Sequence, residues 1–280
     1  MNAALASKLA YLDPGEVKAE AAKWGFENAE FFQQNRTEGF VAWDSQCVLV
    51  SFRGTKELGD WLTDLNALRA SVSYGELHRG FLDAFNDVRS ALRDLVEQAG
   101  ASGKRVWVTG HSLGGALSTI MAGELLGELP IHGIYTFGQP RVVNRRSQAY
   151  FREPYAGRYF RFVNDDDIVP KVPVLLQHVG EILWFDSDGG LKESPPGVRG
   201  EDFGPEALSE EEFAAFQERV RSFQSQINRE HETVTEEPVA QSLSPLATPA
   251  PVTRGLFPSV RDHFMDKYLQ KIWAKVQAEG

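Results

Sequence analysis

The 280-residue sequence predicts an α/β fold in which a central, mostly parallel sheet is flanked by helices. Strand and helix patterns alternate through the middle of the chain. A strand-like run at residues 106–109 leads through a glycine-rich turn at 110–114 straight into an apolar helical pattern. Two further apolar runs, 134–137 and 159–163, each end in a polar loop, which is typical of the sheet edge where ligands bind. We therefore expect one domain over residues 1–280.

The first half of the chain contains a helix and three strands before that turn. The helical pattern covers residues 15–24, directly after Pro14, a residue that favours the first helical turn. Strand patterns at 29–34, 39–43 and 46–52 are separated by short polar turns, as in antiparallel hairpins. A longer helix is expected over about residues 80–98. Between these lies a short helical pattern whose apolar face contains Leu58, Trp61, Leu62, Leu65 and Leu68.

The second half of the chain carries a long insertion at about residues 186–258. Before it, residues 177–185 predict a hairpin or an edge strand. The insertion is rich in Gly, Pro, Ser and Glu at both ends, and we expect an extended connector at 237–258. A final helix is expected over about 260–277. The insertion also contains one helix, predicted over 209–228, which starts with the capping box Ser209–Glu212 and carries the apolar stripe Phe213, Phe216, Val220, Phe223 and Ile227.

Charge and composition argue against several classes of function and location. The formal net charge is −10 without a long basic run, which disfavours nucleic-acid binding and opposes docking on anionic lipid. Cys47 is the one cysteine, so no intramolecular disulfide can form, and we expect it to be a small buried apolar residue. The first residues lack a basic start and a sustained apolar run, so no signal peptide is evident. A cytoplasmic location is expected, and secretion of a processed form stays open.

The turn between the central strand and its helix has the pattern Gly-x-Ser-x-Gly, which predicts a nucleophilic serine at Ser112. Gly110 and Gly114 remove the side chains that would collide in so sharp a turn. The serine is expected to adopt a strained conformation that pushes its hydroxyl out above the sheet edge. The helix start directs free N–H groups at the place where negative charge develops during acyl transfer. The alternative is a Gly-Ser-Gly cluster that only ends a loop.

A serine hydroxyl needs a base, and the base needs an orienting acid. In this topology the chain order is serine, acid, histidine, so three histidines are candidates. His178 precedes a probable strand and is expected to be structural, and His231 stands between two glutamates and is expected to be solvated. His263 leads from a loop into the last helix, where a base can reach back over the sheet, although it could also simply pair with Asp262.

The acid should come from the loop after the strand at 159–163. Asp165, Asp166 and Asp167 all lie there, and neither composition nor spacing separates them. A solvated acidic turn would have the same sequence.

Seven short motifs in order resemble the class 3 lipases, the family of the filamentous-fungal triacylglycerol lipases. The resemblance covers about residues 5–185 and 260–277 and implies the α/β-hydrolase fold. It implies that Asp167 orients the base His263, and that Thr55 and the N–H of Leu113 form the oxyanion hole beside Ser112. It also places a lid at about residues 56–73. The motifs are Phe52-Arg53-Gly54-Thr55, Trp61-Leu62-Thr63-Asp64-Leu65, His78-Arg79-Gly80-Phe81, Gly110-His111-Ser112-Leu113-Gly114-Gly115, Gly138-Gln139-Pro140-Arg141-Val142, Asn164-Asp165-Asp166-Asp167-Ile168-Val169-Pro170 and Asp262-His263.

The expected function is therefore a serine hydrolase that cleaves carboxylic esters of lipids, with triacylglycerol as first choice of substrate. A carboxylesterase or phospholipase A1 on the same fold is the nearer alternative, and a non-catalytic lipid-binding protein the more distant one. The expected partners are the ester and, transiently, a lipid surface. No metal or organic cofactor is expected, because the sequence has no phosphate-binding glycine loop and no histidines at ligand spacing.

The substrate site is expected to lie under two mobile apolar elements, the segment 56–69 and the inserted helix 209–228. Each has an apolar stripe wide enough to need a partner. For the inserted helix the alternative is that it packs on the core, or mediates a dimer, and never moves.

Overall fold

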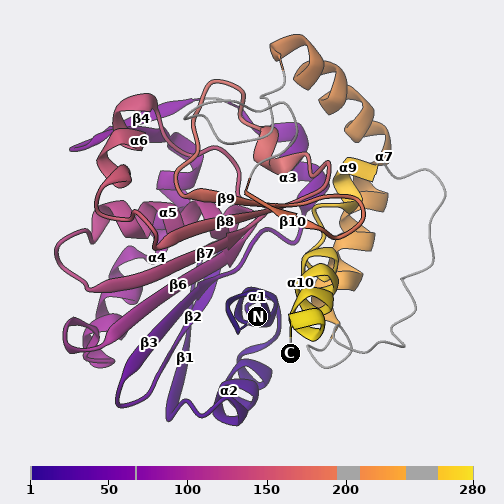
Figure 1. The fold of residues 1–280 in the computed structure, drawn as a ribbon. Helices are drawn as coiled ribbons and strands as arrows, with labels where there is room; N and C mark the ends of the chain where they lie inside the picture. Colours follow the sequence, from indigo (N-terminus) through magenta and orange to yellow (C-terminus); the bar gives the residue numbers. More distant parts are fainter. Residues whose placement is uncertain (1, 67, 194–208, 238–257, 280) are drawn as a thin grey trace.

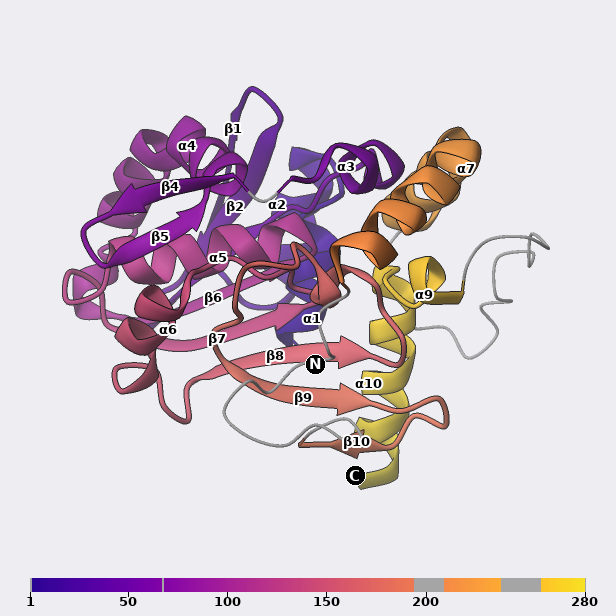
Figure 2. The same cartoon turned by 90° about the horizontal axis from the view of Figure 1, so that it is seen from above.

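A computed structural model describes residues 2–66, 68–193, 209–237 and 258–279 (Figures 1 and 2). Its described part forms an eight-stranded sheet in the order β1-β2-β3-β6-β7-β8-β9-β10. The five strands β3, β6, β7, β8 and β9 run parallel, whereas β1, β2 and β10 pair antiparallel. The predicted mostly parallel α/β sheet is confirmed. The strands are β1 (Asn28–Gln34), β2 (Thr37–Trp43), β3 (Cys47–Phe52), β6 (Arg105–His111), β7 (Ile131–Phe137), β8 (Tyr159–Asn164), β9 (Glu181–Phe185) and β10 (Leu191–Lys192).

Helices cover both faces of this sheet (Figure 2). One face packs against α4 (Arg79–Gln98) and α5 (Leu113–Glu124), and the other against α1 (Asn2–Leu9), α2 (Pro14–Lys23) and α10 (Met265–Glu279). This double cover explains why β3 and β6 are buried on both faces, as expected for central parallel strands. The short helix α6 (Arg145–Arg152) lies beside the β4–β5 hairpin, which is formed by Arg69–Val72 and Gly75–His78.

The remaining helices gather at the carboxyl edge of the parallel strands. They are α3 (Leu58–Asp64), α7 (Glu210–Glu236) and α9 (Pro258–Arg261). In both ribbon views α7 lies against α3 and above the start of α10 (Figures 1 and 2). A shared apolar cluster joins them: Leu58, Leu62, Ile168, Val169, Val220, Ile227, Val234, Val260 and Phe264.

Two predicted apolar faces differ from the structure. The helix of the expected lid ends at Asp64, and Leu68 is 60% exposed in the turn toward β4 rather than buried on that face. The hairpin β4–β5 therefore occupies part of the predicted lid segment 56–73. In α7, Phe223 is 38% exposed, and the buried stripe continues instead from Ile227 to Val234. The helix is longer than predicted because no glycine or proline follows residue 228 until Pro238.

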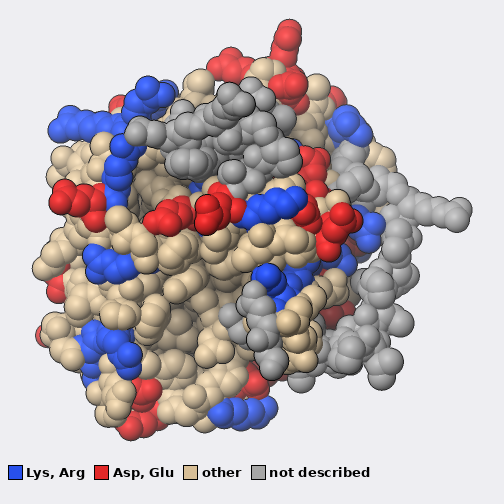
Figure 3. Space-filling view, in the orientation of Figure 1, with Lys and Arg blue, Asp and Glu red and all other residues tan. Residues whose placement is uncertain are grey.

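The N-terminal helix α1 has no counterpart in the predicted elements. Its Ala6, Ser7 and Leu9 are fully buried between the sheet and α10, so this end of the chain is part of the core. The predicted connector at 237–258 lies almost entirely outside the described residues. Among the described helices none is long and apolar enough to cross a membrane. On the face shown in Figure 3, acidic and basic side chains are interspersed.

Candidate active site

Ser112 is the single residue between the end of β6 and the start of α5. Its backbone angles, φ 57° and ψ −128°, lie in a region that non-glycine residues rarely adopt. A Cβ on Gly110 would lie 2.3 Å from the carbonyl carbon of Gly114, and one on Gly114 would lie 2.2 Å from the carbonyl oxygen of Phe52. Only glycine fits at both positions. The turn thus has the sharp strand-to-helix geometry that the sequence predicts for a nucleophilic serine.

His263 and Asp167 form a fully buried pair. The loop after β8 carries Asp167, and the short link between α9 and α10 carries His263. The His263 Nδ1 lies 3.0 Å from both carboxylate oxygens. The same carboxylate accepts hydrogen bonds from the Tyr268 hydroxyl at 2.5 Å and the Val169 N–H at 2.9 Å. Three donors around one carboxyl group suit its ionised form, which only accepts hydrogen bonds.

The backbone brings Ser112 and His263 to the same corner of the sheet edge. The Ser112 N–H donates to the carbonyl of Phe137 at 2.9 Å, and Gly138 follows directly. A Cβ on Gly138 would lie 2.7 Å from two ring atoms of His263. The Ser112 Oγ and the His263 Nε2 are both buried and have no hydrogen-bond partner among the described residues. Because Nδ1 is engaged by Asp167, Nε2 is the nitrogen that can take a proton from serine.

The contacts of the neighbouring aspartates and histidines show which of them belong to the site. Asp166 is exposed and pairs with Lys171, whereas Asp167 is the one of the three aspartates that contacts His263. The structure thereby separates residues that sequence spacing leaves equivalent. His178 is buried and bonds the Pro170 carbonyl at 2.7 Å, which agrees with the expected structural role.

Both residues predicted to hold an oxyanion lie beside Ser112. Leu113 is the first residue of α5, so its N–H is one of the free donors at the helix start. A Cβ on Gly54 would lie 3.1 Å from the Ser112 Cβ, and Thr55 is the next residue. The Thr55 hydroxyl accepts the Glu57 N–H at 3.2 Å, which leaves its own proton available for a second bond. Their roles as oxyanion donors stay predictions.

The expectation that His231 is solvated is wrong. Its side chain is completely buried behind His111, on the inner face of α7. His231 follows Ile227 by four residues, so it lies on the continuation of the apolar stripe, and this spacing could have revealed its burial.

The predicted burial of Cys47 also fails in part, because Cys47 is half-buried and donates its thiol hydrogen to Asp44.

Three aromatic side chains make contacts around the site that the sequence did not predict. His111 bonds the Tyr11 hydroxyl through Nδ1 at 2.8 Å and the carbonyl of His263 through Nε2 at 2.7 Å. Burial holds the pKa of His111 well below its usual value, so the ring is neutral. Since a carbonyl can only accept, Nε2 carries the hydrogen and Nδ1 accepts from Tyr11. Tyr268, on α10, is the third of these residues and steadies Asp167 from a different element.

A cavity of about 360 Å³, lined by both apolar and charged residues, reaches Leu113 from the side of α3. It is lined in part by Trp61, Leu65, Phe81 and Leu113, the residue after Ser112. The Trp61 ring stacks on Phe81 with centroids 6.2 Å apart and 14° between the planes. The size and the apolar part of the lining suit an acyl chain that ends beside Leu113.

Side-chain amides from α7 hold α3 over the site. Gln217 donates to three carbonyl oxygens at the end of α3, at 3.0, 3.0 and 3.1 Å. Asn228 accepts the Gly59 N–H at 2.7 Å and donates to the Asp60 carboxylate at 2.5 Å, and Gln224 donates to the same carboxylate. These contacts favour the alternative in which the inserted helix packs on the core. Whether α3 or α7 moves stays a prediction.

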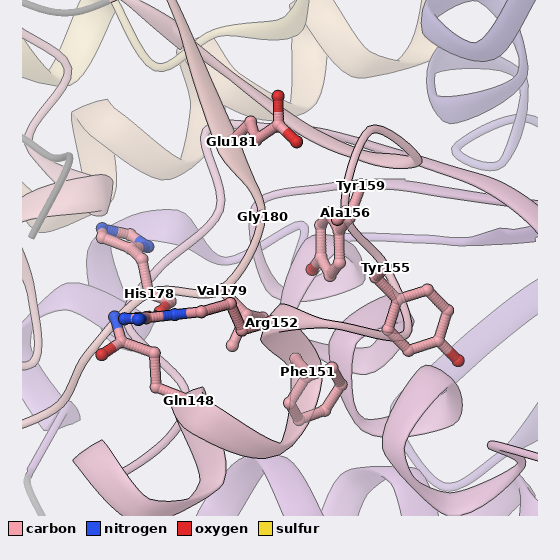
Figure 4. Close-up of a pocket in the computed structure, with 10 residues that line it drawn as sticks. All are labelled: Gln148, Phe151, Arg152, Tyr155, Ala156, Tyr159, His178, Val179, Gly180 and Glu181. Carbon is pink, nitrogen blue, oxygen red and sulfur yellow. Dashed lines mark hydrogen bonds between the residues drawn. The ribbon is translucent and has the colours of Figure 1, made fainter. Parts of the chain in front are cut away.

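A second cavity, of about 330 Å³, lies at the opposite end of the strands (Figure 4). Its lining includes the first residues of β8 and β9, Tyr159 and Glu181, so it opens at the amino edge of the sheet. It is therefore separate from the serine, which lies at the carboxyl edge. Among the described residues no group of His, Cys, Asp and Glu could hold a metal ion.

Comparison with known proteins places this geometry among lipases. Residues 49–177 match the profile of the lipase (class 3) family. Triacylglycerol lipase OBL1 of Arabidopsis thaliana is 32% identical over 250 residues, which are 65% of this chain and 48% of that protein. Phospholipase A(1) DAD1 of the same plant is 32% identical over 150 residues, 45% of this chain and 33% of that protein. The chain thus spans between a third and a half of the length of these relatives. Among solved structures, the native propeptide complex of Rhizomucor miehei lipase is 27% identical with a TM-score of 0.52, over 68% of both chains.

Proposed function

This chain belongs to the class 3 lipase family, and on that basis we propose that it is a serine hydrolase that cleaves carboxylic esters of lipids. One observation carries the proposal. His263, held by Asp167 through Nδ1, leaves its buried Nε2 free at the corner where the Ser112 hydroxyl also lies unbonded. A hydrogen bond between these two unpartnered atoms would activate the serine for attack on an acyl carbon.

The reaction proceeds in two halves. The Ser112 Oγ attacks the ester carbonyl while the His263 Nε2 takes its proton, and Asp167 stabilises the imidazolium that results. Thr55 and the Leu113 N–H bind the oxyanion, and each such donor contributes about 3 kcal/mol. The bond to the alcohol breaks as His263 returns the proton to the leaving oxygen. Water then attacks the acyl-enzyme with its proton going to His263, and release of the carboxylic acid restores Ser112.

Triacylglycerol is the proposed substrate within this class. The partly apolar cavity beside Leu113 supports binding of an acyl chain, and one relative is named a triacylglycerol lipase. A phospholipase A1 is the second candidate, because another relative of equal identity carries that name. We further propose that α3 is a lid, that lipid contact is transient, and that the protein is cytoplasmic.

The test combines a variant, a probe and a substrate panel. Ser112→Ala should lower kcat by about a million-fold with an unchanged fold, and should abolish labelling by a fluorophosphonate. Ser222→Ala, which removes an exposed hydroxyl on α7, is the matched control. Rates on emulsified triacylglycerol, a phospholipid and short soluble esters then rank the substrates. Near-normal turnover by folded Ser112→Ala protein would overturn the proposal.

A further inference from the structure

His231 comes from the insertion yet lies against the catalytic core. Its ring centroid is 5.4 Å from Phe264, 6.0 Å from Tyr11 and 6.4 Å from His111, on which it stacks at 21°. His111 in turn stacks on His263 at 4.6 Å. The inserted helix therefore contacts the layer of side chains directly behind the proposed base.

Among the described residues, this ring has one hydrogen bond, which joins it to the loop of the proposed oxyanion hole. The His231 Nδ1 lies 3.2 Å from the carbonyl oxygen of Lys56, the residue after Thr55. A carbonyl only accepts, so Nδ1 carries the hydrogen. Burial, followed by the charge of His263, lowers the pKa of His231 to about 3, so the ring stays neutral and this bond persists over the working pH range.

The loop depends on such contacts because it lies between β3 and α3 and belongs to neither. Besides the His231 bond, an ion pair of 3.1 Å joins the Lys56 side chain to Glu236, again on α7. The end of α7 is itself fixed, since the buried Lys8 ammonium donates to the carbonyl oxygens of Val234 and Thr235. His231 thus stands on a helix end anchored to α1, about one turn beyond Asn228 and about four turns beyond Gln217, whose amides hold α3.

We propose that His231 is a positioning residue that holds the Thr55–Lys56 segment where Thr55 can donate to the oxyanion. The inference rests on the proposed ester hydrolysis. Without the Nδ1 donor, the half-buried Lys56 carbonyl loses its partner, and the loop relaxes toward other donors. Because the oxyanion forms only in the transition state, the loss should appear in kcat far more than in KM.

Three substitutions separate the hydrogen bond from the packing of the ring. His231→Phe keeps a ring without a donor. His231→Asn places an amide nitrogen where Nδ1 stood, and His231→Gln places it at the position of Nε2. We expect kcat on a soluble ester to fall about 10-fold or more for the Phe and Gln variants, given that a lost oxyanion donor costs about 100- to 1,000-fold. The Asn variant should stay within about 3-fold of wild type, and KM should change less than about 2-fold in all three.

The rate of covalent inactivation by a fluorophosphonate gives a second measurement, because this step also forms an oxyanion-like centre at the serine. It should fall in parallel with kcat, while thermal unfolding shows whether each variant is folded. Thr233→Ala, on the exposed face of α7 two residues away, is the control and should match wild type.

The outcomes separate the two proposals. Wild-type kcat in folded His231→Phe, or a loss in His231→Asn equal to that in His231→Phe, would overturn the positioning role. An equal rise in KM in all three variants would also overturn it, since that would indicate lost substrate binding. Wild-type protein that neither turns over esters nor reacts with the probe would overturn the proposed function, and this inference with it.

Discussion

Removing the Asn228 side chain should weaken the closed position of α3 and speed hydrolysis of dissolved esters. Asn228 holds α3 through two bonds, from the Gly59 N–H at 2.7 Å and to the Asp60 carboxylate at 2.5 Å. Asn228→Ala deletes both and leaves the helix that presents them intact, because alanine is the best helix former. The apolar contacts of Leu58 and Leu62 with α7 remain in the variant.

The size of the effect follows from these two bonds. The bond from Gly59 is neutral and contributes about 1 kcal/mol, and the one to Asp60 involves a charge and contributes about 1.5–3 kcal/mol. The side chains of Asn228 and Asp60 are half-buried, and Gln224 still donates to Asp60 in the variant. The closed position of α3 should therefore lose about 1–2 kcal/mol of stability. The ratio of open to closed molecules should then rise about 5- to 30-fold.

The assay compares one ester below and above its solubility limit. If α3 is a lid, kcat/KM of Asn228→Ala on the dissolved ester should rise about 5- to 30-fold, since only open molecules bind substrate. On an emulsion, where the interface already favours the open form, the rate should stay near wild type. Gln226→Ala is the matched control, because its amide bonds Glu230 within α7. A variant that is unchanged on dissolved ester, or equally slowed on both forms, would refute a lid held by this contact.

Three further predictions follow from the site. Asp167→Asn should lower kcat about 10,000-fold, as in other triads, whereas Asp165→Asn and Asp166→Asn should cost little; a greater loss in either of the latter would contradict the assignment. Trp61→Ala should blunt the rise in rate at the solubility limit, and an unchanged rise in that variant would argue against a moving α3. Burial and the neighbouring aspartates raise the pKa of Asp262 from 3.8 to about 6, so the folded state favours its protonated form and loses stability as pH rises through that window. Asp262→Asn should therefore raise the free energy of unfolding at pH 7 by about 1 kcal/mol, after discounting the partial exposure of Asp262, and should give no gain below about pH 4. An equal gain in stability at both pH values would contradict the link between the Asp262 pKa and stability.

The parts of the fold that sequence could predict are those set by local pattern. The strands that became β1, β2 and β3 and the helices that became α2 and α4 agree with the structure to within a residue or two, because alternation, Pro14 and a one-sided apolar face specify them locally. The elbow was predictable for the same reason, since Gly110 and Gly114 have no alternative at that close approach.

The sequence could not predict the tertiary contacts of the site. Asp165, Asp166 and Asp167 share one local pattern, and only the loop path after β8 decides which reaches His263. His231 has two charged neighbours that suggest solvent, but the helix face it occupies is covered by Tyr11 and Phe264, which lie far away in the chain. Tyr268 likewise has no motif of its own and acts through a bond across 101 residues.

The distance in sequence between the parts of this site has a consequence for the order of synthesis. His111 and the His263 carbonyl it bonds are 152 residues apart, and Lys8 meets a carbonyl 227 residues further on. A ribosome delivers the serine and its sheet well before the histidine emerges, and domains begin to fold from the N-terminal side during translation. The nascent chain thus carries the Ser112 turn before His263 is made, and Lys8 on α1 gains its α7 partners only when the end of α7 has been made. The ability to cleave esters should therefore appear only after the segment that carries His263 has left the ribosome and packed against His111.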